Sequence, residues 1–269
     1  AADNLHRIRG VLNGTCNFLL TKMGASDASF DEVLAEAQDR GFAEADPSAD
    51  LDGVDAQAKL SILSAVGLRR PINPHEIACR SIRGVGRLDF EAAGLLGCGI
   101  RQVSTVELTE EEDAVRAEVG PAMVNLRSRV AQVSGNENVV VVDGISCGEV
   151  TLIGQGAGGG PTAVAIVSDL LAIAAGDGAP NLFPSVRSSY QVGTMGRRLH
   201  YIRVPEPQSA ARILSDLGAE ATRTLKGQGG QVQFVTDGCT TEAVESALKL
   251  DVTTRGNRAE NYVALPIID

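Results

Sequence analysis

The sequence has no excess of basic residues. Its 24 Lys and Arg residues are outnumbered by 34 Asp and Glu residues, which gives a formal net charge of −10 and a pI near 4.9. Nucleic acids and anionic membranes bind proteins through basic surfaces that displace counterions. We therefore expect no nucleic-acid or membrane partner, and small molecules are the ligands that this composition favours.

Paired cysteines are also lacking. The five cysteines are odd in number, scattered and never spaced as C-x-x-C: Cys16, Cys79, Cys98, Cys147 and Cys239. This pattern is typical of reduced thiols and argues against a disulfide framework or a zinc site. The three histidines have no cysteine or acidic partner at metal-ligand spacing, so we expect them to be structural. No export signal begins the sequence, and a cytoplasmic protein without a metal is expected.

Long apolar runs are absent too. The longest, 163–175, contains Asp169 and falls short of the roughly 20 residues that a membrane-spanning helix needs. What the chain has instead is a globular composition, 43% hydrophobic and 22% charged over 269 residues. This length favours one medium and one small domain, each with its own core.

The first third of the chain predicts helices. Residues 1–12 are helix-forming types, and a polar break at 13–15 separates them from a second apolar run. Ser29 and Glu32 form a capping-box pattern, and Gly41 is placed to end the helix that this pattern opens. Helices are therefore expected to cover whatever sheet the rest of the chain forms.

The middle of the chain predicts a sheet between helices. A helix is predicted over 55–66, with Gly67 as its stop. From 82 to 143 the sequence changes to β-rich runs separated by Gly, Asn and Pro. A strand over 149–153 then leads through a glycine-rich turn into a helix over 162–174.

A domain boundary is predicted within 177–196, which is rich in Gly, Pro and Ser, with domains over 1–180 and 190–269. The elements after it are predicted in the order strand, helix, strand, strand, helix, strand, over 199–204, 208–217, 221–226, 231–236, 241–250 and 261–267. This βαββαβ order is the ferredoxin-like arrangement. The predicted fold class is α+β: a mixed β-sheet covered by helices, followed by a ferredoxin-like domain.

The most informative stretch is 41–59, which places five carboxylates ahead of one lysine. Asp55 and Lys59 are i and i+4 on the predicted helix, so both can point at one site. A solvated acidic loop with a surface ion pair is the alternative, because such pairs are common and weak. A calcium loop is disfavoured, since 50–53 supplies only a fragment of the ligand pattern and no glutamate closes it.

Three blocks carry a resemblance to a known family. GVLNGTCNFLL, EVLAEAQDRGFAEADPSADLDGVDAQAKLSIL and GQGAGGGPTAVAIVSDL resemble homoserine dehydrogenase, and they lie in that family's order within residues 8–171. The resemblance implies NAD(P)H-dependent interconversion of aspartate 4-semialdehyde and L-homoserine, in threonine, methionine and isoleucine biosynthesis. It also implies that NADP or NAD is bound mainly by an N-terminal Rossmann domain that this sequence lacks. The chain alone is then expected to be inactive.

The resemblance assigns roles to single residues. It implies that Lys59 supplies a proton to the substrate oxygen and that Glu44 and Asp55 hold the substrate's ammonium group. The chemistry agrees, because burial disfavours a charged lysine and an ammonium group needs anionic acceptors. Asp50 and Thr15 are further candidates for polar contacts to the substrate.

The glycine-rich segment 154–159 satisfies G-x-G-x-x-G between a strand and a helix. No strand ending in an acidic residue follows about 20 positions later, as a dinucleotide-binding unit requires. The resemblance implies instead that Gly158 and Gly160, together with Gly41, approach the cofactor from the substrate-domain side. A plain helix-packing turn is the alternative. The family usually has tyrosine at position 42, and Phe42 removes that hydroxyl from the site.

The C-terminal module resembles an ACT-type ligand-sensing domain, which implies threonine as an effector. Such domains usually place a glycine after their first strand, whereas this chain reads Val204-Pro205-Glu206-Pro207-Gln208. A dimerising or packing module without a ligand is equally compatible with the pattern. A homodimer or higher homo-oligomer is expected. The rival function for the whole chain is a non-catalytic, amino-acid-sensing regulatory or dimerisation protein.

Overall fold

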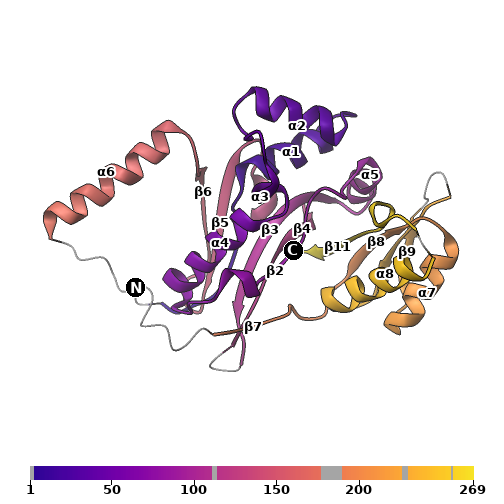
Figure 1. Ribbon diagram of the computed structural model, residues 1–269. Coiled ribbons are helices and arrows are strands. Elements are labelled where there is room, and N and C mark those ends of the chain that lie inside the picture. Colours follow the sequence, from indigo (N-terminus) through magenta and orange to yellow (C-terminus); the bar gives the residue numbers. More distant parts are fainter. Residues whose placement is uncertain (1–2, 111–113, 177–189, 226–229, 256) are drawn as a thin grey trace.

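A computed structural model describes residues 3–110, 114–176, 190–225, 230–255 and 257–269 (Figure 1). The helices described are α1 (Gly14–Ala25), α2 (Phe30–Asp39), α3 (Ser48–Leu51), α4 (Val54–Leu63), η1 (Ser64–Leu68), η2 (Pro74–Glu76), α5 (Arg87–Leu95), η3 (Arg129–Gln132), α6 (Gly159–Ala175), α7 (Pro207–Leu217), α8 (Thr241–Arg255) and η4 (Ala259–Asn261). The strands described are β1 (Leu5–Val11), β2 (Ala78–Cys79), β3 (Cys98–Leu108), β4 (Ala114–Asn125), β5 (Glu137–Gly144), β6 (Gly148–Gln155), β7 (Gln191–Gly193), β8 (His200–Val204), β9 (Ala221–Leu225), β10 (Val232–Thr236) and β11 (Val263–Ile268).

The strands form one mixed sheet in two parts. The larger part has the order β6-β5-β1-β3-β4, with every neighbouring pair antiparallel. The smaller part has the order β11-β8-β10-β9, also antiparallel. Strand β11 joins them, because it pairs in parallel with β4 through Ile267 opposite Met123. The mixed sheet and the ferredoxin-like strand order confirm the predicted fold class.

Helices α1 to α5 cover one face of the larger sheet. Ile8 of β1 is buried on that face and packs with Leu60 of α4. Its neighbours in the strand, Arg7 and Arg9, lie on the opposite face beside Thr105 of β3. Side chains that alternate between two faces are typical of a strand. The expectation that residues 1–12 favour a helix is therefore wrong.

The ends of two helices follow the sequence signals differently. Gly41 has a φ of +71° just after α2, which confirms it as the residue that ends that helix. Gly67, by contrast, does not end the second helix, which continues from α4 through the π-helical turn η1 to Leu68. A Cβ on Gly67 would come within 2.6 Å of the Ile8 side chain. Glycine is needed there for packing against β1.

Helix α5 lies within the stretch 82–143, for which the sequence predicts β-rich runs and no helix. Its Asp89 is fully buried and accepts hydrogen bonds from Tyr201 at 2.9 Å and from Arg203 at 2.8 and 3.1 Å. Both partners belong to β8. The smaller sheet is thus packed against the helical layer of the larger one, with Tyr201 and Leu265 in the same apolar core as α1.

The predicted domain boundary lies mostly in 177–189, outside the described residues. Residues Gln191–Gly193 pair with β4 and so belong to the larger sheet, and the smaller sheet begins at β8. Within the described residues, no helix combines the length and apolar character that crossing a membrane requires.

Candidate active site

A pocket of about 430 Å³ lies where all three sequence blocks meet. Its walls are the N-terminus of α1, the loop after α2, the segment from α3 to α4, the start of β5, and the turn between β6 and α6. These segments come from residues 13 to 158, so the pocket is built by tertiary folding. The predicted site residues Thr15, Gly41, Glu44, Asp50, Asp55, Lys59 and Gly158 all line it.

The first wall is the start of α1. Asn13 is buried and caps this helix, because its side-chain oxygen accepts a hydrogen bond from the backbone N–H of Cys16 at 2.8 Å. The next two residues, Gly14 and Thr15, face the pocket. A Cβ on Gly14 would come within 2.8 Å of the carbonyl oxygen of Asn136. A glycine therefore lets the start of α1 pack against the backbone of Asn136 at the pocket.

The loop after α2 forms the second wall. The hydroxyl of Thr15 donates a hydrogen bond of 2.6 Å to the carbonyl oxygen of Phe42, which ties this loop to α1. Glu44 is exposed in the pocket, and its carboxylate has no hydrogen-bond partner within the described part of the chain. Arg40 also lines the pocket, with its guanidinium paired to Glu36 at 2.7 Å. This wall brings one free carboxylate and one cation to the pocket.

The third wall carries Asp50, whose backbone is held by two hydrogen bonds. Its carbonyl oxygen accepts hydrogen bonds from the Cys16 thiol at 3.1 Å and from the Gln102 side chain at 3.2 Å. Burial, followed by the charges of Asp50 and Asp55, raises the pKa of the Cys16 thiol far above its ordinary value. Cys16 therefore stays protonated as a donor, and its role here is structural.

Helix α4 begins at a glycine and presents the predicted acid and lysine. Gly53 has a φ of +83°, and a Cβ there would come within 2.5 Å of the Cys79 sulfur. The Nζ atom of Lys59 lies 2.7 Å from Oδ2 of Asp55, its i,i+4 partner, and 3.2 Å from the carbonyl oxygen of Leu12. The lysine side chain is 45% exposed, so it is held in place and still accessible.

The last wall joins β5 to the glycine-rich turn. Asn138 lines the pocket and donates to the carbonyl oxygen of Leu12 at 3.2 Å, the same oxygen that Lys59 binds. Gly158 caps α6 with a φ of +113° and borders the pocket. Gly160, in the first turn of α6, does not line it, and its predicted cofactor role stays a prediction.

The turn does not form a Rossmann unit. Strand β6 lies at the edge of the sheet and pairs with β5 alone within the described residues.

Sequence reasoning missed Asn13, Arg40, Asn136 and Asn138 as residues of the pocket. The only sequence signal was for Asn13, because asparagine followed by glycine ahead of an apolar run is typical of a helix start.

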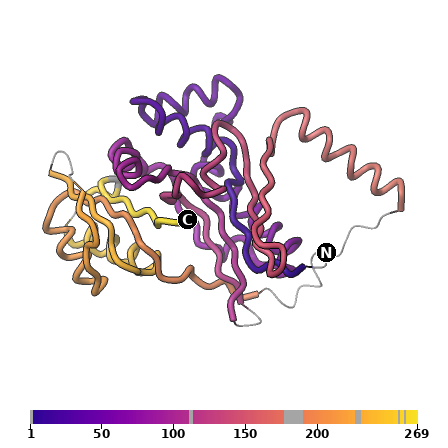
Figure 2. Tube along the Cα trace, turned by 180° about the vertical axis from the view of Figure 1, so that it is seen from behind, coloured from indigo at the N-terminus to yellow at the C-terminus, as the bar shows by residue number. Residues whose placement is uncertain are grey.

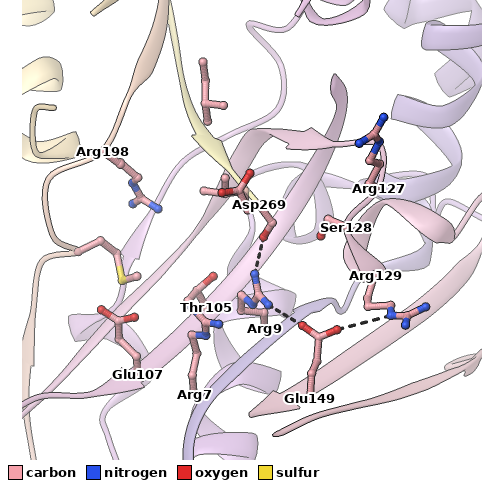
Figure 3. A pocket seen from close by; sticks show the side chains of 13 residues that line it. Arg7, Arg9, Thr105, Glu107, Arg127, Ser128, Arg129, Glu149, Arg198 and Asp269 are labelled. Atoms are coloured by element: carbon pink, nitrogen blue, oxygen red, sulfur yellow. Dashed lines mark hydrogen bonds and ion pairs between the residues drawn. The ribbon is translucent and has the colours of Figure 1, made fainter. Parts of the chain in front are cut away.

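A larger cavity, about 640 Å³, lies on the other face of the sheet (Figure 3). Arg9 pairs there with Glu149 at 3.0 Å and also donates to the carbonyl oxygen of Asp269. Arg129 approaches the same glutamate at 3.6 Å. None of the predicted site residues lies there. The smaller pocket is therefore the candidate active site.

Comparisons with known proteins identify the family. A family model for homoserine dehydrogenase matches residues 1–171. The homoserine dehydrogenase of Synechocystis sp. is 38% identical over 195 residues, which are 70% of this chain and 45% of that protein. A homoserine dehydrogenase crystal structure from Thiobacillus denitrificans matches with a TM-score of 0.80 and 28% identity over 100% of this chain and 65% of that one. A hyperthermophilic archaeal homoserine dehydrogenase mutant in complex with NADPH gives 0.53 and 30% identity, over 69% of this chain and 50% of that one. The chain thus spans less than half of the Synechocystis protein.

Proposed function

The chain belongs to the homoserine dehydrogenase family, and from that premise we propose that it is the substrate-binding and catalytic part of an NAD(P)-dependent homoserine dehydrogenase. The observation that carries the proposal is the convergence of Glu44, Asp50, Asp55 and Lys59 on one pocket. These four side chains come from the loop after α2, from α3 and from α4, and all of them border the same pocket. The reaction proposed is the interconversion of aspartate 4-semialdehyde and L-homoserine.

The charges of the pocket suit an amino-acid substrate. The ammonium group of homoserine is gripped by the carboxylates of Glu44, Asp50 and Asp55. The substrate's carboxylate faces the positive end of α1 and the guanidinium of Arg40. With opposite charges bound at one end, the substrate's hydroxyl or aldehyde end is left to reach Lys59. The polar lining thus orients the substrate as well as binding it.

Lys59 is the proposed acid and base. An ammonium group has three N–H donors, and two of them are engaged by Asp55 and by the carbonyl oxygen of Leu12. The third is left for the substrate oxygen. During reduction Lys59 donates a proton to the aldehyde oxygen as hydride reaches the carbon, and during oxidation it takes the proton back from the hydroxyl. A nicotinamide cofactor, when bound, supplies or accepts the hydride.

The glycine rim of the pocket fits such a cofactor. Gly41 and Gly158 lack side chains at positive φ, and a Cβ on Gly41 would meet no atom within 4 Å. The N-terminus of α6 adds backbone N–H groups beside them, as a ligand that carries phosphates requires. The solved NADPH complex of an archaeal relative supports a nicotinamide dinucleotide, NADP or NAD.

Helix α6 is the proposed contact to the cofactor domain. It extends away from the sheet in both views (Figure 1, Figure 2), and none of its residues is buried. Its apolar side chains are largely exposed, including Val164 at 67%, Leu171 at 66% and Ile173 at 71%. We propose that the nucleotide-binding part of the longer relatives covers them. Because α6 begins at the pocket, this contact brings the cofactor to the site.

Three further proposals concern regulation, assembly and location. The βαββαβ arrangement supports an ACT-like regulatory module with an amino acid such as threonine as effector. A homodimer or higher homo-oligomer is the default for such an enzyme. All five cysteines are free, which supports a cytoplasmic location.

The test is turnover of a protein that carries this chain together with a nucleotide-binding domain. It is expected to oxidise L-homoserine with NADP or NAD. Lys59→Ala is expected to lower kcat by about a hundredfold or more, the scale of losing a proton-transfer group. Lys249→Ala, on α8 of the smaller domain, is the matched control and should leave kcat unchanged. Equal turnover in the two variants would contradict the role of Lys59.

A further inference from the structure

Asn13 contacts two acids of the pocket at once. Its Nδ2 atom lies 2.7 Å from Oδ1 of Asp50 and 2.9 Å from Oδ2 of Asp55. A primary amide nitrogen carries two hydrogens, so each acid receives one. The two acids lie 37 and 42 residues further along the chain, on different helices. Asn13 is the side chain that joins them.

The orientation of this amide is fixed by helix α1. The amide oxygen accepts the hydrogen bond from Cys16 that caps the helix, and it sits at the opposite end of the group from the nitrogen. Capping therefore directs both N–H groups toward Asp50 and Asp55. Asn13 is 4% exposed, so its side chain is held in place by the surrounding structure. The helix start and the acid pair are set by one side chain.

An uncharged donor is suited to this position. Two carboxylates that approach one nitrogen repel each other, and the positive end of an amide dipole offsets that repulsion. A lysine there would also neutralise one acid and weaken the pocket's attraction for an ammonium group. The amide leaves both negative charges in place. Through Asp55, which also binds Lys59 at 2.7 Å, it reaches the proposed proton donor as well.

We infer that Asn13 is a positioning residue, which holds Asp50 and Asp55 at the spacing that grips the substrate's ammonium group. The inference rests on the proposed function, since it assumes that an amino acid occupies the pocket. It assigns no contact between Asn13 and the substrate. Its consequence is that losing the amide should weaken the binding of amino-acid ligands and spare ligands that lack the amino group.

The test compares two ligands on the 269-residue chain, with binding followed by NMR shifts of the pocket amides. The ligands are L-homoserine and 4-hydroxybutyrate, which is the same molecule without the amino group. Asn13→Ser keeps a helix-capping oxygen and removes the bridge. Asn73→Ser is the control, because Asn73 also caps a short helix but lies outside the pocket. Asn13→Thr, which also caps, replaces the serine variant if that variant does not fold.

Asn13→Ser is expected to weaken L-homoserine binding by about 10- to 100-fold, the scale of losing two hydrogen bonds to charged groups. The affinity for 4-hydroxybutyrate should stay within about twofold of that of the unsubstituted chain. Asn73→Ser should change neither. An equal loss for both ligands would show a merely structural role and overturn the inference, as would no loss for homoserine. Failure of the unsubstituted chain to bind homoserine would overturn the proposed substrate, and the inference with it.

Discussion

The buried imidazole of His200 makes hydrogen bonds through both ring nitrogens. His200 is fully buried at the start of β8. Its Nδ1 lies 3.1 Å from the carbonyl oxygen of Arg198 and must donate to it. Its Nε2 lies 3.1 Å from Oγ1 of Thr241, which also accepts from Arg198 at 3.1 Å, and in the neutral ring Nε2 accepts the hydrogen of that hydroxyl. The neutral ring satisfies every partner.

This environment makes the protein's stability depend on pH. Burial, followed by the charges of Arg198 and Arg80, lowers the pKa of His200 from 6.5 to about 3. The unfolded chain takes up a proton below its ordinary pKa, whereas the folded chain does not. Stability from this group is therefore full above about pH 6.5 and is lost as the pH falls toward about 3. At about 1.4 kcal/mol per pH unit, the loss at pH 5 is about 2 kcal/mol.

Urea unfolding of the natural chain and of His200→Gln at about pH 7.5 and about pH 5 measures this loss. Groups that titrate in both proteins cancel in the difference between their free energies of unfolding. The glutamine variant should be the less stable one at the higher pH, and its deficit should shrink by about 2 kcal/mol at the lower pH. Two curves that run parallel with pH would refute the reasoning.

Two other substitutions test the packing around the core and the pocket. Asp89→Asn should lower the free energy of unfolding by about 3–5 kcal/mol in urea titrations, because Arg203 is left buried without a counter-charge. Glu91→Gln is the control: it removes the exposed ion pair of Glu91 with Arg87 on the same helix and should cost less than about 1 kcal/mol. Gly156→Ala should weaken homoserine binding in NMR titrations with little loss of stability, because a Cβ there would come within 2.3 Å of the Asn138 side chain, and Gly154→Ala, with open space around it, should not.

The C-terminal elements from β8 to β11 could be predicted from the sequence almost one by one. Helix α7, predicted over 208–217, spans Pro207–Leu217, and β8, predicted over 199–204, spans His200–Val204. These elements are short, amphipathic and bounded by their own turn signals, so local pattern is enough to place them. The strand order then follows from the few topologies that such an order of elements allows.

The elements that the sequence misplaced depend on contacts that are distant in the chain. β1 contains residues that favour a helix, yet it lies between β3 and β5, where its backbone groups are paired on both sides. Helix α5 is fixed through Asp89 by two residues of β8, more than 100 positions later. Tertiary contacts of this kind override local propensity, and a single sequence does not display them.

The residues of the candidate site also fall into two groups, those that a local pattern could predict and those brought in by tertiary contacts. Asp55 and Lys59 are separated by one helical turn, so a local pattern could predict that they share a face. Asp50 joins them through tertiary contacts, which include the amide of Asn13, 37 residues earlier, at the start of another helix. Asparagine at that position is a sufficient explanation for a helix cap, and nothing local indicates that its other end binds two acids. A residue with an ordinary structural explanation can thus be the one that sets the geometry of a pocket, because capping fixes its oxygen and leaves its nitrogen free to act at the site.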